Sequence, residues 1–314
     1  MEKRLVVSQS PHIRTPRTTP AIMLDVVIAL LPAAVMGSII FGWRALLVLL
    51  TCTATAVISE FLFCAITKRE QSVGDLTAVI TGLLLGLNLR ADTPLWQCVL
   101  GSVFAVVVVK CLFGGTGSNF ANPAVTGRIF MMLCFAGAVS GGTQLLPGEG
   151  GAELVSTSTP LSTITAGGEL PSLFDMFFGF YGGAIGETCT AALLVGFVYL
   201  VIRRVIYLET PLIFIGTVFV LSLIVDNSFS VALYQILSGG LILGAVFMAT
   251  DYVTTPITRS GKMIFCLGAG VITFLIRYYG SYPEGVSFAI LFMNILSPYV
   301  EKWTKNRPLG GKKA

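Results

Sequence analysis

Long apolar runs, separated by short polar segments, recur from residue 22 almost to the end of the chain. Runs of about 20 apolar residues are long enough to cross a bilayer as helices. Lipid-facing strands are excluded because their backbone groups would find no partners there, and the alternation typical of barrel strands is absent. The pattern predicts ten helices, over residues 22–41, 45–66, 74–89, 95–113, 124–139, 184–201, 211–225, 231–248, 263–278 and 286–300.

The composition identifies the class of protein to which this pattern belongs. Hydrophobic residues make up 54% of the 314 residues and charged residues 11%, and the mean hydropathy is +0.85. Soluble domains carry about 25% charged residues, so a soluble protein is excluded. We predict an all-α polytopic membrane protein with about ten transmembrane helices.

The basic residues predict the orientation of these helices. If the N-terminus lies in the cytoplasm, 17 of the 20 lysine and arginine residues are cytoplasmic, and only Arg44, Arg90 and Arg277 lie outside. Cytoplasmic loops of membrane proteins carry such an excess of basic residues. Both termini are therefore expected in the cytoplasm.

The chain divides into a basic leader (1–19), a five-helix half (20–139), an extracytoplasmic loop (140–183), a second five-helix half (184–301) and a basic tail (302–314). Residues 81–86 (TGLLLG) resemble residues 239–244 (GGLILG). An odd number of helices per half makes the two repeats inverted in the membrane. The alternatives are a chance match, or glycines that serve close helix packing.

A stretch of small and hydroxyl residues, 182–190 (GGAIGETCT), lies where the long polar loop meets the sixth predicted helix. Its glycines permit left-handed backbone conformations and close approach to a flat ligand. Thr188 and Thr190 lie at a helix start, whose free N–H groups and dipole favour a phosphate. The alternative is an ordinary loop-to-helix junction in which a threonine caps the helix.

Two more polar segments lie between predicted helices on the cytoplasmic side, residues 114–124 (GGTGSNFANPA) and 250–256 (TDYVTTP). Each is rich in amides or hydroxyls and contains a proline, which readily begins a helix. They form either two capped turns or a polar ligand pocket, since side-chain amides both donate and accept hydrogen bonds.

Four acidic residues lie near the cytoplasmic ends of predicted helices: Asp25, Glu60, Asp75 and Asp251. An ionisable group within a span is costly unless it is paired or hydrated, so each is a candidate for an ion path. Pairing with Lys110 or Arg128, predicted on the same side, is the simpler alternative.

Metal and haem sites are not indicated. The seven cysteines are scattered singly through apolar segments without a C-x-x-C pair, so neither a zinc nor an iron–sulfur ligand set is evident. We expect them to be small buried residues. The single histidine, His12, lies in the polar leader, and no residue set points to a catalytic centre.

A resemblance to a known family rests on residues 10–14 (SPHIR), the 114–124 loop, residues 249–251 (ATD) with Pro256, and residues 186–190 (GETCT). With these motifs, in this order, the chain resembles the RnfD/NqrB family nearly end to end. It is closer to the Rnf branch, since the long N-terminal extension expected of NqrB is missing.

The resemblance implies a subunit of the Rnf complex in the bacterial inner membrane. This complex moves electrons between ferredoxin and NAD and couples the transfer to export of Na+ or H+. The oxidoreductase and translocase activity would belong to the complex, with no complete activity in this chain alone. The expected partners are the lipid bilayer, the other subunits (A, B, C, E and G) and a flavin transferase.

The resemblance also implies a covalent flavin. In the family, FMN is joined through its phosphate to a threonine in the motif Ser/Thr-Gly-Ala-Ser/Thr-x-Ser/Thr, by a transferase that works outside the membrane. Gly186, Thr188 and Thr190 match the motif, whereas Ile185 and Glu187 depart from it. Thr188, on the outer side, is then the acceptor of a phosphothreonine ester. The cofactor-binding residues expected at this site are Thr188, Gly186, Gly183 and Thr190.

A second, non-covalent flavin is implied near the Asn-x-x-Asn-Pro loop. It is either riboflavin or another FMN. Asn119, Asn122 and Thr81 match the positions expected to hold it.

Two other functions compete with the electron relay. Inverted five-helix halves and glycine-rich helices equally fit a solute channel or transporter without a redox cofactor, in which Thr188 is only a cap. The chain is alternatively a passive scaffold subunit, whose complex keeps its activity when Thr188 is removed.

Overall fold

The computed structural model describes residues 17–148, 151–166, 168, 170–280 and 284–305. The leader with His12 and the 10–14 motif, and the basic tail from residue 306, lie outside the described residues.

The first half begins with two long helices and continues with shorter pieces. Its elements are α1 (Thr19–Phe41), α2 (Trp43–Thr67), η1 (Val73–Asp75), α3 (Thr77–Leu87), α4 (Leu95–Val103), η2 (Phe104–Cys111) and α5 (Pro123–Cys134). The second half contains α9 (Thr190–Ile202), α10 (Glu209–Asp226), α11 (Phe229–Leu237), α12 (Leu241–Leu243), η3 (Gly244–Met248), α13 (Arg259–Tyr279) and α14 (Val286–Trp303). Both η2 and η3 are π-helical.

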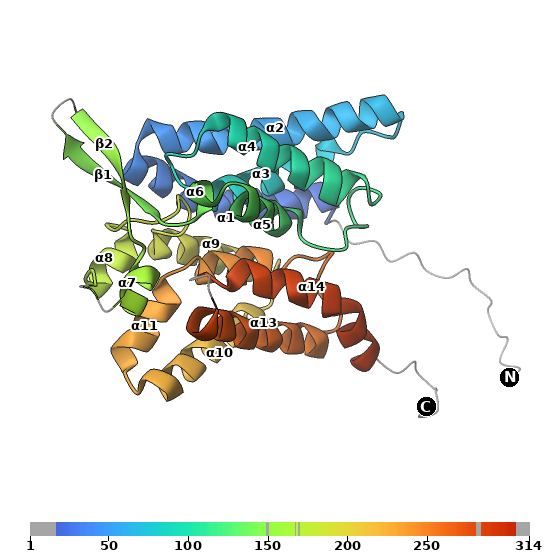
Figure 1. The fold of residues 1–314 in the computed structure, drawn as a ribbon. Helices are drawn as coiled ribbons and strands as arrows, with labels where there is room; N and C mark the ends of the chain where they lie inside the picture. The colour runs from blue at the N-terminus through green and yellow to red at the C-terminus, as the bar shows by residue number, and fades with distance from the viewer. Residues whose placement is uncertain (1–16, 149–150, 167, 169, 281–283, 306–314) are drawn as a thin grey trace, which may run out of the picture.

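The connection between the halves has secondary structure that the sequence did not predict. It contains β1 (Gly142–Gly148), β2 (Gly151–Thr157), α7 (Pro160–Ala166) and α8 (Leu173–Phe178). Just before it, α6 (Ala136–Val139) ends the range predicted as helix over 124–139. The strands β1 and β2 form an antiparallel hairpin in which Gly142 pairs with Thr157. This hairpin projects from the helical bundle (Figure 1).

The chain is a multi-pass helical membrane protein. Every predicted helical range contains helix. Within the described residues, α1, α2, α10 and α13 are long and apolar enough to span a membrane, and α11 with α12 and η3 makes a fifth, bent by 62°. Apolar side chains such as Leu31, Val35 and Ile39 are exposed along α1, as expected for a helix that faces lipid.

One predicted helix in each half of the chain is interrupted. The helix predicted over 231–248 is broken before α12, where Gly239 and Gly240 have φ values of 72° and 62°. A residue in the left-handed backbone conformation ends a helix, and glycine adopts this conformation at no steric cost. In the first half, Leu76 has a φ of 59° between η1 and α3.

The bundle has two distinct ends (Figure 1). We call the end at which α1 begins and α14 ends the terminal end, and the opposite end, which carries β1 and β2, the hairpin end. Helix α1 begins at the terminal end and α9 runs back alongside it. The contact between α1 and α9 joins the two halves of the chain.

Close approach of α1 and α9 depends on Gly196. A Cβ atom at this position would lie 2.1 Å from the carbonyl oxygen of Ala29. We expect Gly196→Ala to lower the free energy of unfolding by about 1–3 kcal/mol, the usual cost of overpacking. Gly216→Ala in α10, where nothing lies within 4 Å of the added atom, is the matched control and should be neutral or slightly stabilising. Unfolding in detergent measures both, and equal effects would contradict this packing.

Candidate functional site

The stretch around the predicted flavin acceptor, residues 182–190, lies between α8 and the start of α9, at the hairpin end, and is irregular up to Cys189. We call it the acceptor segment. The Gly186 N–H donates to the carbonyl of Leu87, the last residue of α3, at 2.7 Å. The Gly183 backbone pairs with Thr143 of β1. A Cβ atom on Gly186 would lie 2.6 Å from Leu87 Cβ, so glycine is needed for this close approach. The segment is therefore held between α3 and the hairpin.

Thr188 is fully buried in this segment, and its hydroxyl has no hydrogen-bond partner among the described residues. Helix α9 begins at Thr190 with Cys189 as its N-cap, and no side chain caps it. The alternative in which Thr188 is an ordinary helix cap is therefore wrong. The adjacent Glu187 is 4% exposed, and both of its carboxylate oxygens also lack hydrogen-bond partners in the described chain.

Buried charges surround the acceptor segment. Arg128 of α5 pairs with Glu284, which precedes α14, and its Nη1 donates to Asn88 Oδ1 at 2.8 Å. Arg277, in the last turn of α13, donates to backbone carbonyls at the break before α12, including that of Ser238 at 3.0 Å. Glu187 interacts electrostatically with both arginines.

Tyr181 links the acceptor segment to the same helix break. Its hydroxyl lies 3.3 Å from the carbonyl oxygen of Glu187 and 3.4 Å from that of Leu237, the last residue of α11. The acceptor segment and the interrupted helix therefore form one site.

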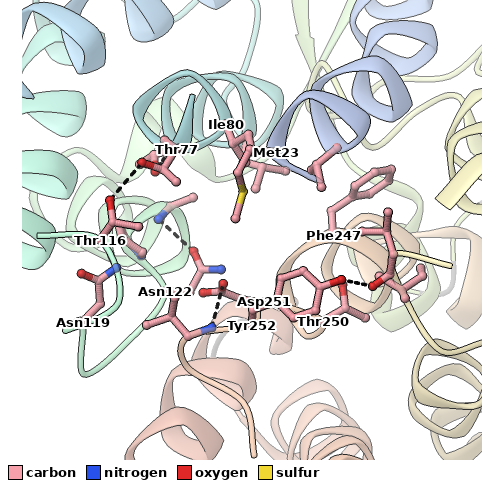
Figure 2. Close-up of a pocket in the computed structure, with 18 of the residues that line it drawn as sticks. Met23, Thr77, Ile80, Thr116, Asn119, Asn122, Phe247, Thr250, Asp251 and Tyr252 are labelled. Carbon is pink, nitrogen blue, oxygen red and sulfur yellow. Dashed lines mark hydrogen bonds between the residues drawn. The ribbon is translucent and has the colours of Figure 1, made fainter. Parts of the chain in front are cut away.

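A pocket opens at the terminal end, and Figure 2 shows its lining. It brings together residues that are far apart in the sequence. They include Met23, Val26, Thr77, Ile80, Thr81, Leu84, Lys110, Thr116, Asn119, Asn122, Phe247, Thr250, Asp251 and Tyr252. The two polar segments predicted at 114–124 and 250–256 thus meet at one pocket, with Thr81 from α3.

The amides of this pocket differ in their contacts. Asn122 caps α5, because its Oδ1 accepts from the N–H of Ala124 at 3.0 Å. Asn119 Oδ1 is buried without a partner among the described residues. Asp251 accepts from the hydroxyl of Thr254 at 3.0 Å. The loops are therefore capped turns, and they also present polar groups to a common space.

Lys110 reaches the pocket from η2 and is neutralised there. Its Nζ lies 2.8 Å from both carboxylate oxygens of Glu60 and 2.6 Å from Thr77 Oγ1. Lys110 is 1% exposed and Glu60 is fully buried. The hydroxyl of Ser72 also donates to Glu60.

The four acids predicted as ion-path candidates do not form one continuous row of contacts. Glu60 pairs with Lys110, as the simpler alternative predicted, while Asp25 pairs with Arg203 at 3.1 Å. Asp75 lies in η1, and Asp251 lines the pocket. The prediction that Arg128 pairs with one of these four acids is wrong, because a residue from the distant α13–α14 connection provides its carboxylate.

Lys110 was named from the sequence only as a partner for an acid and Arg277 only as an outer basic residue, and neither was connected with a helix break. Lys110 contacts Thr77, which follows the left-handed Leu76, and Arg277 contacts the carbonyls of Ser238 and Gly239. A basic residue within an apolar run indicates a functional site. Both Lys110 and Arg277 lie in such runs, so this pattern could have identified them.

The cysteines are free, and six of the seven are buried; Cys134 is exposed. No group of three or more histidine, cysteine or acidic side chains suited to a metal occurs in the part of the chain that the structure describes.

Comparison with known proteins places the chain in a family. The sequence model of the NQR2, RnfD, RnfE family matches residues 6–310. The D subunit of the Na(+)-translocating ferredoxin:NAD(+) oxidoreductase complex of Acetobacterium woodii is 42% identical, over 98% of this chain and 96% of the relative. The proton-translocating counterpart of Clostridium ljungdahlii is 37% identical, over 98% and 96%. The D subunit of the ion-translocating oxidoreductase complex of Escherichia coli O7:K1 is 31% identical, over 98% and 99%. The chain therefore belongs to the NQR2, RnfD, RnfE family.

Proposed function

We propose that this chain is the flavin-carrying membrane subunit of an ion-translocating ferredoxin:NAD+ oxidoreductase complex, with FMN esterified to Thr188. The observation that carries the proposal is the Thr188 hydroxyl, which is buried and unpartnered among the described residues, in the motif that resembles the family's acceptor site. Buried polar groups nearly always have partners, so an orphan hydroxyl calls for an explanation. The names of the relatives support the complex.

Attachment of the flavin is an exchange of phosphate esters. The Thr188 hydroxyl loses its proton and its oxygen forms a bond to the phosphorus of a flavin dinucleotide. The pyrophosphate bond of the dinucleotide breaks, and a nucleoside monophosphate takes the proton as it leaves. The protein gains FMN minus water. Because the hydroxyl is buried in the folded chain, the transferase must act while this segment is open.

We assign the second flavin to the pocket at the terminal end. Its lining combines apolar side chains with the amides and hydroxyls of Asn119, Asn122 and Thr81, which suits a flat ring with polar edges. The cation of Lys110 is matched by Glu60, and Asp251 adds a carboxylate to the lining. No described lining residue therefore offers an unmatched cation to a phosphate, which favours riboflavin over a second FMN.

The interrupted helices support ten spans in two inverted repeats. Each half has a break before its half-helix, α3 or α12, and each break receives a basic side chain from the last turn of the next helix. Lys110 lies at the terminal end and Arg277 at the hairpin end. Short or interrupted helices in matching positions of two halves mark ligand sites in inverted-repeat folds. With the termini in the cytoplasm, Thr188 faces the outer side.

The two flavins would supply one- and two-electron redox chemistry, and the protein supplies their placement and surroundings. One site lies at each end of the bundle, so electrons relayed between them cross the membrane. In the complex, this relay connects the ferredoxin and NAD modules and accompanies export of Na+ or H+. The other subunits and a flavin transferase are the partners this requires.

Asn119→Leu is expected to remove the non-covalent flavin and leave the covalent flavin in place. The leucine takes away a side-chain amide that lines the pocket, whereas the site at Thr188 lies at the opposite end. Flavin extracted from acid-denatured, purified protein measures the effect, with Asn227→Leu, outside the pocket, as the control. Full retention of extractable flavin in Asn119→Leu would contradict this assignment.

A solute transporter without a cofactor remains the rival, and the bent α11–α12 helix is the observation that favours it. Colour discriminates between the two functions. Purified protein from cells that contain the transferase should be yellow and fluorescent if the relay is right. Colourless protein would favour the transporter, and a flavin-bearing complex that kept full activity without Thr188 would favour a scaffold.

A further inference from the structure

Two arginines that interact electrostatically with Glu187 carry unpartnered polar groups, as does its neighbour in the chain, Thr188. Besides its hydroxyl, the Nε atoms of Arg128 and Arg277 are buried without hydrogen-bond partners among the described residues. The two side chains belong to residues that are 2% and 5% exposed. A buried guanidinium N–H without a partner is costly, so two of them in the region of the acceptor segment indicate a missing acceptor.

The two arginines differ in how their charge is balanced. Arg128 forms an ion pair with Glu284. Arg277 donates to the backbone carbonyls of Gln235, Ser238 and Gly239 and to the Gln235 side chain, which are all uncharged. Within the described residues no salt bridge neutralises Arg277, and a buried cation requires a counter-charge.

The break before α3 in the first half shows the contrast. There Lys110 is already neutralised by both oxygens of Glu60. An anion is therefore unnecessary at the terminal end, whereas at the hairpin end no carboxylate of the described residues forms a salt bridge with Arg277. A phosphodiester carries one negative charge and oxygens that accept from guanidinium groups.

We propose that Arg277 is the positioning residue that binds the phosphodiester between FMN and Thr188, with Arg128 Nε as a second donor. This inference rests on the proposed covalent flavin and adds the residues that hold its phosphate. Tyr181 keeps the acceptor segment against the helix break, so the cation and the ester belong to one rigid unit. The arrangement places the charged flavin beside Arg277 and the uncharged flavin beside the neutralised Lys110.

Glu187 is the competing counter-charge for Arg277, because the two interact electrostatically. Glu284 also acts on Arg277, but it is already paired with Arg128. The two assignments predict different effects of flavin attachment. If the phosphodiester is the counter-charge, attachment stabilises the protein through Arg277. If Glu187 is, attachment brings a second anion to an already neutral pair and gives no stabilisation.

The test compares thermal unfolding midpoints of protein produced with and without the flavin transferase, after intact mass has established the flavin content of each sample. Attachment is expected to raise the wild-type midpoint by roughly 2–4 °C. Arg277→Gln should lose this rise, Arg277→Lys should keep at least half of it, and Glu187→Gln should keep it in full. Flavin-bearing Arg277→Gln with the full rise would overturn the inference, as would a loss of the rise in Glu187→Gln.

A measurement on the wild type alone covers the case in which Arg277→Gln does not fold or does not accept flavin. The ³¹P resonance of the linked phosphodiester in the folded protein should differ clearly from that of the proteolytic peptide carrying Thr188. Identical resonances would overturn the role of Arg277 while leaving the covalent flavin intact. Absence of flavin from wild-type Thr188 would instead overturn the proposed function and this inference together.

Discussion

Thr188→Val is expected to abolish the covalent flavin completely. Valine keeps the branched shape of threonine but has no oxygen to form the ester with the flavin phosphate. Because the Thr188 hydroxyl makes no hydrogen bond within the described residues, its removal breaks none there and the fold should survive. In-gel fluorescence under denaturing conditions, with intact mass, measures the loss.

Thr190→Val distinguishes the acceptor from its neighbour, because it removes the other hydroxyl of the motif, at the first residue of α9, and should lower the amount of attached flavin at most without abolishing it. A Thr188→Val protein that still carried covalent flavin would move the acceptor elsewhere. Equal loss in both variants would instead indicate that the hydroxyls act together in recognition by the transferase.

Lys110→Met is expected to lower the free energy of unfolding by about 3–5 kcal/mol, because it leaves the carboxylate of Glu60 buried without its cation. The pair has almost no access to solvent, so water cannot replace the lost partner. Lys110 also donates to Thr77 at the break before α3, so the pocket at the terminal end should lose its non-covalent flavin as well. Reversible unfolding in mixed detergent micelles measures the stability.

The double variant Lys110→Met/Glu60→Leu separates charge from shape. Removal of both charges should recover most of the stability, since replacing a buried pair by apolar residues is often neutral. Arg259→Met, which breaks the exposed pair with Glu209, should have little effect. A double variant as unstable as Lys110→Met would show that packing, and not the unpaired charge, dominates.

The helices were predictable because lipid imposes a minimum apolar length, and each predicted range contains helix. The interruptions of these helices were harder to predict from the sequence. The glycines at 239 and 240 lie inside an apolar run, where small residues equally serve helix packing, and Leu76 carries no sequence signal for its left-handed conformation. The hairpin was missed because glycines and hydroxyl residues dominate its segment.

The sequence indicates the candidate site where a local motif carries it, and gives no indication where distant residues complete it. The stretch around Thr188 and the segment containing Asn119 and Asn122 are contiguous patterns, and the structure brings the latter together with Thr81. Arg277 and Glu284 meet the acceptor region only through tertiary packing, in which α13 packs against α10 and α14, and α14 packs against α5 of the first half. Pairing charges by the predicted side of the membrane alone therefore gave Arg128 the wrong acidic partners.

The covalent flavin on Thr188 is tested most directly by the intact mass of the purified wild-type protein, produced in cells that contain the flavin transferase, followed by peptide mapping. We predict a mass increase equal to FMN minus water, located on the peptide that contains Thr188. An unmodified mass, with the transferase shown to be active on another substrate in the same cells, would contradict the covalent flavin and with it the relay function proposed for this chain.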